Sequence, residues 1–356
     1  MKILHISHHI GCMRDHAYIY EKLGFDYEFW KFPKGLFTIT KEIANNIWNE
    51  RKEYFNRFDF IVTSDTAPLS RIFMENLIDC KPKIIVWICN RFDYNMEIDP
   101  SFYEIFNFIS INNKDKVNII PYSDFEGIWC HLRQISPILP TITPIGINFK
   151  GLDYKIDGLQ ELQQGYLEDD NSHQAYRDDS ELLGKMFIPI YGNDNRFFHL
   201  KNLFETAGIE YFNGGYKHPN DLKLCKGLVT FPDAFSKLIT FETIQNEVVV
   251  FLPSVDFLLR LIYTTNNNNN NNNNTLYWFN CPLQVNKQIV EICEWYRYPE
   301  CRVYFDSIED MTYKIQNISE ETLKEKKKWC RYYAEKIERE NIEKWKKIFD
   351  VTAIVK

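Results

Sequence analysis

Short apolar runs rich in β-branched residues recur along this chain, and each is followed by a turn and a segment of helical periodicity. Residues 2–7, 58–63 and 83–88 are such runs, and residues 186–191 begin a second series. Continuous apolar runs of this kind are typical of strands in a parallel sheet that is covered by helices on both faces. The sequence therefore predicts an α/β protein built on parallel sheets.

The order of these runs divides the chain into two domains. Residues 1–150 carry the first series and residues 186–318 carry the second, so we expect two Rossmann-like domains. Residues 151–185 are polar and acidic with little periodic apolar content, which is typical of a linker. Residues 319–356 show a long helical pattern with an apolar stripe, which suits a helix that bridges two domains.

Two further features refine this division. An uninterrupted asparagine run at 266–274 cannot bury apolar surface and predicts a disordered loop inside the second domain. Additional strands are expected at 108–111, 138–145, 209–212, 227–231 and 248–252.

The charge of the chain restricts its partners and location. Its net charge is −7 and its pI is about 5.7, whereas binding to a phosphate backbone usually needs a basic surface. We therefore expect no nucleic-acid partner. No apolar stretch reaches the roughly 18 residues that a membrane span requires, and residues 1–10 lack the apolar core of a signal peptide. These features predict no transmembrane segment.

The cysteines and acidic residues argue against a metal site. Nine cysteines are scattered singly with no C-x-x-C pair, which favours reduced thiols in the cytoplasm over disulfides or zinc. The acidic run at 168–170 lies in the linker and not after a strand. We therefore interpret it as a solvated charge run and not as a metal-binding motif. Neither G-x-x-x-x-G-K-[ST] nor G-x-G-x-x-G occurs, which leaves a P-loop ATPase or an NAD enzyme unsupported. We expect no metal and no cofactor.

One segment of the second domain combines groups that suit a nucleoside diphosphate. A strand ends near residue 231 and a helix begins near Lys237, where Ser236, Lys237 and Thr240 offer donors to an anion. One turn further on, Glu242 is an acid on an otherwise apolar helix and can accept two hydrogen bonds from a ribose diol. The alternative interpretation is that Ser236 only caps the helix and Glu242 is a surface residue.

The pattern Pro232-x-x-x-Ser236-x5-Glu242, followed by an apolar strand and Pro253-Ser254, resembles the donor-site segment of GT-B glycosyltransferases. It is similar in particular to a poorly characterised group of glycosyltransferase-like proteins. The resemblance covers most of residues 1–318 and includes Asn90 to Asp93, Ser110 to Lys114, Trp295-Tyr296 and Tyr304 to Ser307. It implies two Rossmann-like domains that face a cleft, and metal-independent sugar transfer from a nucleoside-diphosphate sugar to a glycan or protein acceptor.

The resemblance also implies roles for individual residues. Glu242 would bind the donor ribose, and the donors of the preceding loop would hold the diphosphate. Arg196 and Lys201 are candidates for the basic pair that neutralises the leaving diphosphate, although the usual spacing of that pair is not kept. Retaining members carry two glutamates separated by seven residues, whereas here the nearest earlier acid, Asp233, stands nine positions before Glu242. Inversion and retention therefore both remain open.

Residues after the first strand are candidates for the acceptor side. Gly11 permits close approach of the backbone to a donor phosphate. His8 and His9 flank this position, and either can act as a general base because the pKa of histidine lies near neutral pH. The alternative, that each is simply a solvated loop histidine, is the simpler interpretation.

Two other strand ends carry candidate catalytic groups. Asp65 ends the second buried run and is a second candidate base. Arg91 and Asp93 follow the strand at 83–88, where they would orient an acceptor or simply pair with each other.

Several functions stay open at this point. Sugar transfer from a nucleotide donor is the leading hypothesis. A nucleotide-sugar epimerase would use the same fold without an acceptor, and a non-catalytic relative would only bind a nucleotide, a glycan or a partner protein. A glucosyltransferase acting on DNA bases is least favoured, because the chain is acidic.

Overall fold

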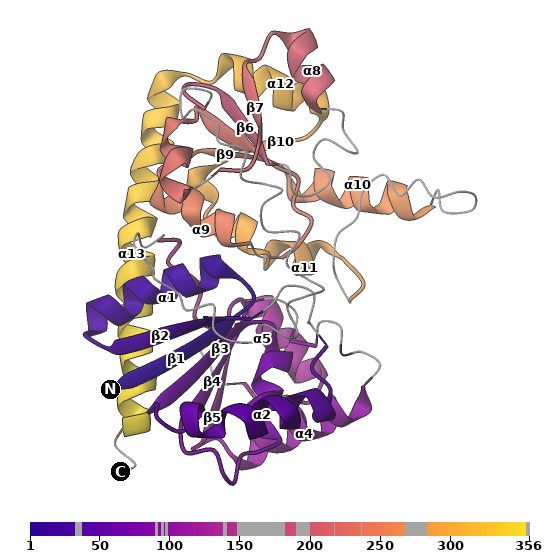
Figure 1. Cartoon of the computed structure of the whole chain (residues 1–356). Coiled ribbons are helices and arrows are strands. Elements are labelled where there is room, and N and C mark those ends of the chain that lie inside the picture. Colours follow the sequence, from indigo (N-terminus) through magenta and orange to yellow (C-terminus); the bar gives the residue numbers. More distant parts are fainter. Residues whose placement is uncertain are drawn as a thin grey trace. The chain divides into compact units, whose positions relative to one another are not determined.

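The chain folds into two compact units, shown in the computed structural model of Figure 1. Unit 1 comprises residues 1–171 and 338–356, and unit 2 comprises residues 172–337. The structure describes residues 1–32, 38–89, 92–93, 96, 99–137, 141–147, 182–189, 200–216, 218–235, 237–267 and 283–353.

The sheet of unit 1 has five strands, and all of its neighbouring strands run parallel. Their order across the sheet is β2-β1-β3-β4-β5. Such a sheet is buried on both sides, which explains the continuous apolar runs in its strands. The strands are β1 (Lys2–Ser7), β2 (Asp26–Lys31), β3 (Phe60–Asp65), β4 (Lys83–Ile88) and β5 (Val117–Pro121).

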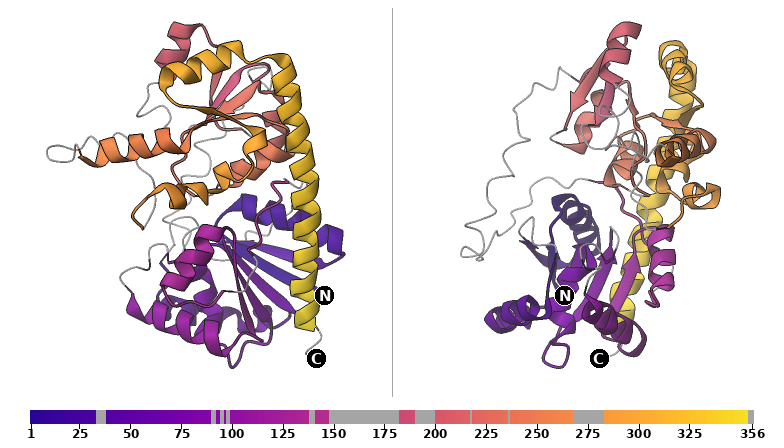
Figure 2. Two further views of the ribbon diagram at one scale, coloured as in Figure 1. Left: turned by 180° about the vertical axis from the view of Figure 1, so that it is seen from behind. Right: turned by 90° about the vertical axis from the view of Figure 1, so that its right-hand side faces the viewer.

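Helices cover both faces of this sheet (Figure 2). Neighbouring residues of β2 show the two layers: the ring of Phe29 lies 6.3 Å from that of Tyr20 on α1, and the ring of Trp30 lies 5.6 Å from that of Phe55 on α2. The helices are α1 (Ile10–Leu23), α2 (Lys41–Phe55), the 3₁₀ turn η1 (Ala67–Ser70), α3 (Arg71–Met74), α4 (Pro100–Asn112) and α5 (Asp124–Leu132).

Unit 2 repeats the strand order of unit 1. Its five parallel strands are arranged β10-β9-β8-β6-β7, so in both sheets the first strand of the unit lies between the second and the third. The strands are β6 (Met186–Pro189), β7 (Tyr211–Gly214), β8 (Gly227–Val229), β9 (Val250–Pro253) and β10 (Arg302–Phe305). The helices are α8 (Leu200–Ala207), η3 (Pro219–Leu224), α9 (Leu238–Gln245), α10 (Val255–Asn267), α11 (Lys287–Glu291), η4 (Glu294–Tyr296), η5 (Pro299–Cys301) and α12 (Ile308–Asn317).

The last helix, α13 (Glu320–Ala353), contributes to both units, because the unit boundary falls at Glu338. Its C-terminal part completes the core of unit 1. The Trp345 side chain is fully buried and its ring lies 4.7 Å from that of His16 on α1. Asn341 Nδ2 donates a hydrogen bond to the carbonyl oxygen of Thr143 at 2.6 Å. Unit 1 is therefore assembled from two separate stretches of sequence.

These observations confirm the predicted fold class of two parallel α/β sheets with a long C-terminal helix. The expected strands at 2–7 and 83–88 coincide with β1 and β4 residue for residue. The expected asparagine loop at 266–274 and linker at 151–185 lie almost entirely outside the described residues.

The strand expected at 108–111 is wrong, because these residues lie in α4. Asp99 caps that helix by accepting from the backbone N–H of Ser101, and Pro100 occupies its first position, a combination that favours a helix start. Phe102, Phe106 and Ile109 then fall on one buried face with helical spacing. The next strand of the sheet is instead β5.

The strand expected at 138–145 is also wrong in the part that the structure describes, since residues 141–147 pair with no strand. Pro144 has no N–H to offer to a ladder, and side chains bind the neighbouring backbone. Trp87 Nε1 donates to the carbonyl oxygen of Ile142 at 2.8 Å. Asp15 accepts from the backbone N–H groups of residues 145–147 at 2.7–3.3 Å. This segment forms no strand and is held by these side chains and by a backbone hydrogen bond from the Ile142 N–H to the carbonyl oxygen of Pro121 at 3.0 Å.

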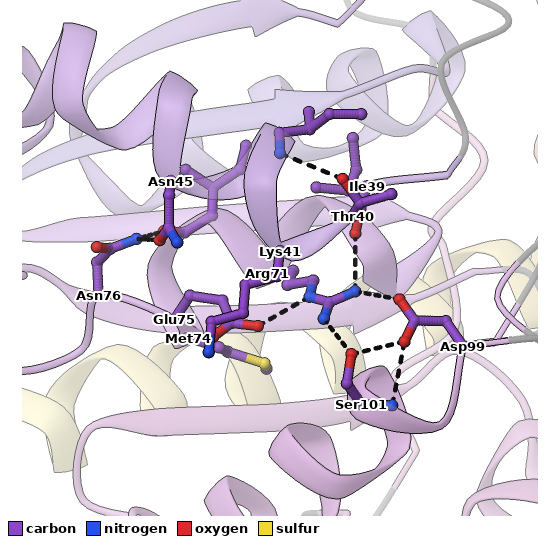
Figure 3. A network of polar contacts seen from close by, with 12 residues as sticks. Ile39, Thr40, Lys41, Asn45, Arg71, Met74, Glu75, Asn76, Asp99 and Ser101 are labelled. Carbon is purple, nitrogen blue, oxygen red and sulfur yellow. Dashed lines mark hydrogen bonds and ion pairs between the residues drawn. The ribbon is translucent and has the colours of Figure 1, made fainter.

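A buried arginine ties together the helices on one face of the unit 1 sheet (Figure 3). The Arg71 side chain is fully buried at the start of α3. Its guanidinium donates to Glu75 Oε1 at 3.0 Å, to the carbonyl oxygen of Ile39 at 3.1 Å and to Ser101 Oγ at 2.7 Å. It also lies 2.6 Å from Asp99 Oδ2. The cation is therefore fully compensated, and it joins the segment before α2 to α3 and α4.

Candidate functional site

Both sheets contain a point at which the direction of winding reverses. The chain passes from β1 to β2 on one side and then to β3 on the other, and β6 lies between β7 and β8 in the same way. Ligands of doubly wound folds bind outside the carboxyl ends of the strands at such a point. The ends of β1 and β3 in unit 1, and of β6 and β8 in unit 2, are therefore the candidate positions.

We call the first of these positions the unit 1 edge. Ser7 of β1 pairs with Ser64 of β3, and Asp65 of β3 pairs with Ile88 of β4, so the three strands end level. The candidate residues gathered here are His8 and His9 after β1, Gly11 and Cys12 in the first turn of α1, Asp65 at the end of β3 and Cys89 after β4.

The two histidines of the unit 1 edge have different surroundings. The His8 side chain is 3% exposed, and its ring packs edge-on against Phe32 at 5.3 Å. His9 is exposed and caps α1, because its Nδ1 accepts a hydrogen bond from the N–H of Gly11 at 3.1 Å. His9 is thus the more accessible of the two histidines, and a phosphate at Gly11 would compete with it for the same N–H.

Asp65 combines backbone strain with a shifted pKa. Its φ of 79° is in the left-handed region, which is uncommon for a residue other than glycine and occurs preferentially at functional sites. Burial and, to a smaller extent, the nearby Cys12 raise the pKa of its carboxyl group to about 7, while His9 opposes the shift. A carboxyl group that titrates near neutral pH is suited to general acid–base catalysis.

Two cysteines join this edge, and we did not expect them there. Cys89 Sγ donates to the carbonyl oxygen of Trp87 at 3.5 Å, and Cys12 is its neighbour at this edge. The nearby Cys89, together with His9 and Ser64, lowers the pKa of the Cys12 thiol although burial opposes the shift. Burial and the nearby Cys12 raise the pKa of Cys89. No spacing in the sequence connects the two cysteines, because the strand order alone brings them together.

The second position, which we call the unit 2 edge, consists of the loop 230–237 after β8 and the first turns of α9. Lys237 precedes α9, and its Nζ lies 2.6 Å from Asp233 Oδ1. The charge of this lysine is therefore balanced within the loop, and an anion bound here would share or displace that pairing. The segment at the start of η4 holds this loop in place. The carbonyl oxygen of Phe235 accepts from the Glu294 N–H at 2.9 Å and from Cys293 Sγ at 2.8 Å.

Glu242 lies one turn into α9 and is only 7% exposed. Its Oε2 accepts a hydrogen bond from the hydroxyl group of Tyr216, which follows β7. The alternative that Glu242 is a surface residue is thereby excluded. A buried carboxylate held by a phenol is a preorganised acceptor group, because burial of an uncompensated carboxylate would be costly.

Two buried polar groups lie beside the first turn of α9. The Thr240 side chain is fully buried, and its Oγ1 has no hydrogen-bond partner among the described residues. Arg302 at the start of β10 is 1% exposed, and its Nη2 lies 3.5 Å from the carbonyl oxygen of Thr240. Its Nε and Nη1 contact no acceptor within the part of the chain that the structure describes. This arginine is a buried positive charge close to α9.

The structure thus gathers most of the predicted residues into two groups. His8, His9, Gly11 and Asp65 share the unit 1 edge, and Lys237, Thr240 and Glu242 share the unit 2 edge. Lys201 is an exposed residue on α8. Arg91, Arg196 and Ser236 lie outside the described residues.

The described ranges contain no candidate metal site and no candidate membrane span. Within these ranges, no group of three or more His, Cys, Asp or Glu residues is arranged to hold a metal ion. No described helix is both long enough and apolar enough to cross a membrane.

Comparisons with known proteins give a distant structural likeness. No protein-family model matches the sequence, and no curated protein matches it. Among solved structures, a crystal structure of a candidate UDP-N-acetylglucosamine 2-epimerase from Listeria monocytogenes is similar, with a TM-score of 0.46 and 9% identity. The match covers 92% of this chain and 90% of that chain. A likeness at this level carries no argument about function, which rests on the residues themselves.

Proposed function

We propose that the chain binds a nucleoside-diphosphate sugar at the unit 2 edge and transfers the sugar to an acceptor hydroxyl group. The observation that carries this proposal is the buried Glu242, whose carboxylate is held by Tyr216 one turn into α9. A carboxylate at this position can accept hydrogen bonds from two vicinal ribose hydroxyls. The resemblance of Pro232 to Ser254 to a GT-B donor segment gives the same assignment.

The diphosphate would lie at the start of α9. Helix N-termini attract anions through their free N–H groups and the helix dipole. Lys237 would exchange its contact with Asp233 for a phosphate oxygen, and the buried Arg302 adds positive potential beside the same turn. These charges would stabilise the diphosphate as it leaves.

The unit 1 edge carries a second candidate group, a general base. Burial and the neighbouring Cys12 raise the pKa of Asp65 to about 7, so its carboxylate can take up a proton near neutral pH.

A nucleotide-sugar epimerase is the second candidate, and the carboxyl group of Asp65 favours it. Proton removal from carbon also needs a base with a pKa near the working pH, and Asp65 has one at about 7. The two activities differ in their need for an acceptor. Conversion of the nucleotide sugar without any acceptor, while the nucleotide stays attached, would select the epimerase.

A thermal-shift panel of UDP-, GDP-, CDP- and dTDP-sugars tests the donor site. Ligand at about 100 times its Kd stabilises the native state by about 2.7 kcal/mol, which is readily visible. We expect one nucleotide class to stabilise the wild type and Glu242→Gln to lose most of that shift. Glu205→Gln is the matched control, since Glu205 also accepts from a tyrosine hydroxyl, that of Tyr211, at 2.9 Å but lies on α8. Absence of a shift with every nucleotide, or an equal loss in both variants, would contradict the proposal.

A further inference from the structure

The part of α13 that belongs to unit 2 has two faces of opposite character. Cys330 and Ala334 lie on its buried face. Gln245 Nε2, at the end of α9, donates to the carbonyl oxygen of Ala334 at 3.4 Å, so unit 2 covers this face. The other face is open to solvent, and the side chains of Trp329 and Tyr332 on it are 36% and 51% exposed. Two large aromatic side chains on one helix face are a feature of interaction surfaces.

Four residues form a stripe along the exposed face. They follow one another at intervals of four, three and four residues: Glu325, Trp329, Tyr332 and Lys336. At 3.6 residues per turn, these positions lie within about 60° of one another around the helix axis. The same spacing forms the seam along which two helices pair in a coiled coil. We call these four residues the α13 stripe.

The aromatic rings at the middle of the α13 stripe have a fixed arrangement. The ring of Trp329 lies 5.7 Å from that of Tyr332, edge-on, and 6.1 Å from that of Tyr333. Tyr333 is anchored to unit 2, because its hydroxyl group donates to Glu300 Oε2 at 2.8 Å and its ring lies 5.0 Å from that of Tyr298. Rigid Trp and Tyr side chains dominate the centres of protein interfaces. The middle of the stripe therefore suits a protein partner.

The charged ends of the α13 stripe form no ion pair with any residue that the structure describes. Glu325 is exposed and Lys336 is half-buried. They are about 17 Å apart along the helix and cannot pair with each other. Arg331 of the same helix, by contrast, is paired with Glu247 at 3.0 Å. One acid and one base at opposite ends of the stripe are thus available to a partner.

The α13 stripe is complementary to itself. Consider a second copy of the helix that runs antiparallel, with a two-fold axis midway between Trp329 and Tyr332. Trp329 then faces the partner's Tyr332, and Glu325 faces the partner's Lys336. Each of these contacts occurs twice, because a two-fold interface uses the same surface of both copies. The order of charge, ring, ring and opposite charge is the one that such an axis requires.

The surroundings of the stripe also favour the antiparallel direction. Lys328 and Glu335 border it on one side, and both are exposed. In the antiparallel pair, Lys328 lies near the partner's Glu335, as charged residues do beside a helix seam. A parallel pair in register would place Glu325 against the partner's Glu325 and so bring like charges together.

We propose that the α13 stripe is the two-fold interface of a homodimer, in which the α13 helices of two copies pair antiparallel. The partner that fits this surface is a second copy of the chain. Because the seam is short, association is weak and has a Kd on the order of tens of micromolar. The inference is independent of nucleotide binding at the unit 2 edge.

Sedimentation velocity of the full chain between about 1 and 200 µM tests the proposal. We expect a monomer–dimer equilibrium, and Trp329→Ala should raise its Kd at least about ten-fold. Tyr313→Ala is the matched control, since Tyr313 is an aromatic residue of α12 in the same unit and is 64% exposed. It should leave the Kd unchanged. A chain that is monomeric at every concentration, or an equal effect of both variants, would overturn the proposal.

Charge reversal gives a sharper test, because it has an internal rescue. Lys336→Glu alone brings two acids together at each end of the seam, and Glu325→Lys alone brings two bases together. Each should raise the Kd at least about ten-fold. The double variant should restore the wild-type Kd, and an equimolar mixture of the two single variants should form a heterodimer. Misfolding cannot produce this pattern, and a double variant that stays monomeric would contradict the antiparallel pairing.

A membrane surface is the other occupant that exposed Trp and Tyr side chains can have. Co-sedimentation with vesicles of phosphatidylcholine and phosphatidylserine tests it on the same proteins. We expect no binding that depends on Trp329. Vesicle binding that Trp329→Ala abolishes, by a chain that stays monomeric, would assign the α13 stripe to a membrane surface and overturn the proposal.

Discussion

Nη1 of Arg71 lies 2.6 Å from Oδ2 of Asp99, the residue that caps α4. With Glu75, Ile39 and Ser101 as the other acceptors, each nitrogen of this fully buried guanidinium has a partner. The guanidinium also lowers the pKa of Asp99, together with Ser101 and against the effect of burial. The other buried arginine of the described chain, Arg302, has two nitrogens without an acceptor in the same set of residues. The two arginines should therefore respond differently to replacement.

Arg71→Met should be strongly destabilising. It removes the cation from a buried network, in which Glu75 then keeps only its contact with Lys41 and Asp99 keeps those with Ser101. Breaking a buried pair from one side typically costs about 3–5 kcal/mol. Urea unfolding of the variant measures the loss. Arg339→Met, at an exposed position on α13, is the control and should change the free energy of unfolding by less than about 0.5 kcal/mol.

Arg302→Met should be close to neutral or stabilising. The guanidinium loses its hydration on burial and regains little of it, so an apolar chain of similar length removes a cost. Equilibrium unfolding without added ligand is the measurement, and we expect a change within about 1 kcal/mol. A loss as large as that for Arg71→Met would mean that Arg302 is compensated by residues outside those described.

Asp15→Asn should change the pH dependence of stability. Burial raises the pKa of Asp15 to about 7, although the backbone N–H groups of residues 145–147 favour its ionised form. The native state therefore holds a proton between about pH 4 and 7 that the unfolded state has lost. This contribution to stability is complete below pH 4 and is lost as the pH rises to 7.

The free energy of unfolding measured from pH 4 to 8 gives the test. Relative to the wild type, the Asn variant should lack a decline on the order of 2–4 kcal/mol across this range. Asp65 contributes a decline of the same sign, since its pKa is also raised to about 7, so the variant should keep part of the slope. Parallel curves for the two proteins would contradict the assignment to Asp15.

Tyr216→Phe should weaken binding of the nucleotide sugar. The hydroxyl group of Tyr216 holds the Glu242 carboxylate, and its loss leaves that group with less compensation and less fixed orientation. Loss of one hydrogen bond to a charged group is worth about 1.5–3 kcal/mol, or at least about a ten-fold increase in Kd. Tyr211→Phe removes the equivalent hydroxyl from Glu205 and should leave the Kd unchanged. Equal Kd values for both variants would remove Tyr216 from the site.

The sequence predicts the positions of the central strands better than it predicts the edge strand and the helices beside them. β1 and β4 are short, continuous apolar runs, so their positions follow directly from the residue pattern. β2, with the sequence Asp-Tyr-Glu-Phe-Trp-Lys, lies at the edge of the sheet and is partly exposed. It therefore mixes charged and aromatic residues, and no continuous apolar run marks it as a strand. The run at 108–111 contains the β-branched residues of a strand, but the capping signal at Asp99-Pro100 starts a helix that includes it.

Candidate residues at strand ends were predictable for a similar reason. Parallel strands finish at one edge, so His9 and Asp65 could be named without knowledge of the strand order. The proximity of Cys12 and Cys89 could not, because it depends on β4 lying beside β3, and a sequence pattern does not contain that order. The same holds for Tyr216 and Glu242, which come from separate elements of unit 2.

The division of unit 1 between two stretches of sequence has a consequence for biosynthesis. Ribosomes make proteins from the N-terminus, so residues 1–171 emerge long before residues 338–353, with the whole of unit 2 in between. Until then, the space that Trp345 and Phe349 fill beside Tyr20 and Phe60 stays open. Nascent unit 1 would expose this aromatic surface to chaperones. Unit 2 consists of the single stretch 172–337, so it can complete its fold before unit 1 does, although its synthesis begins later.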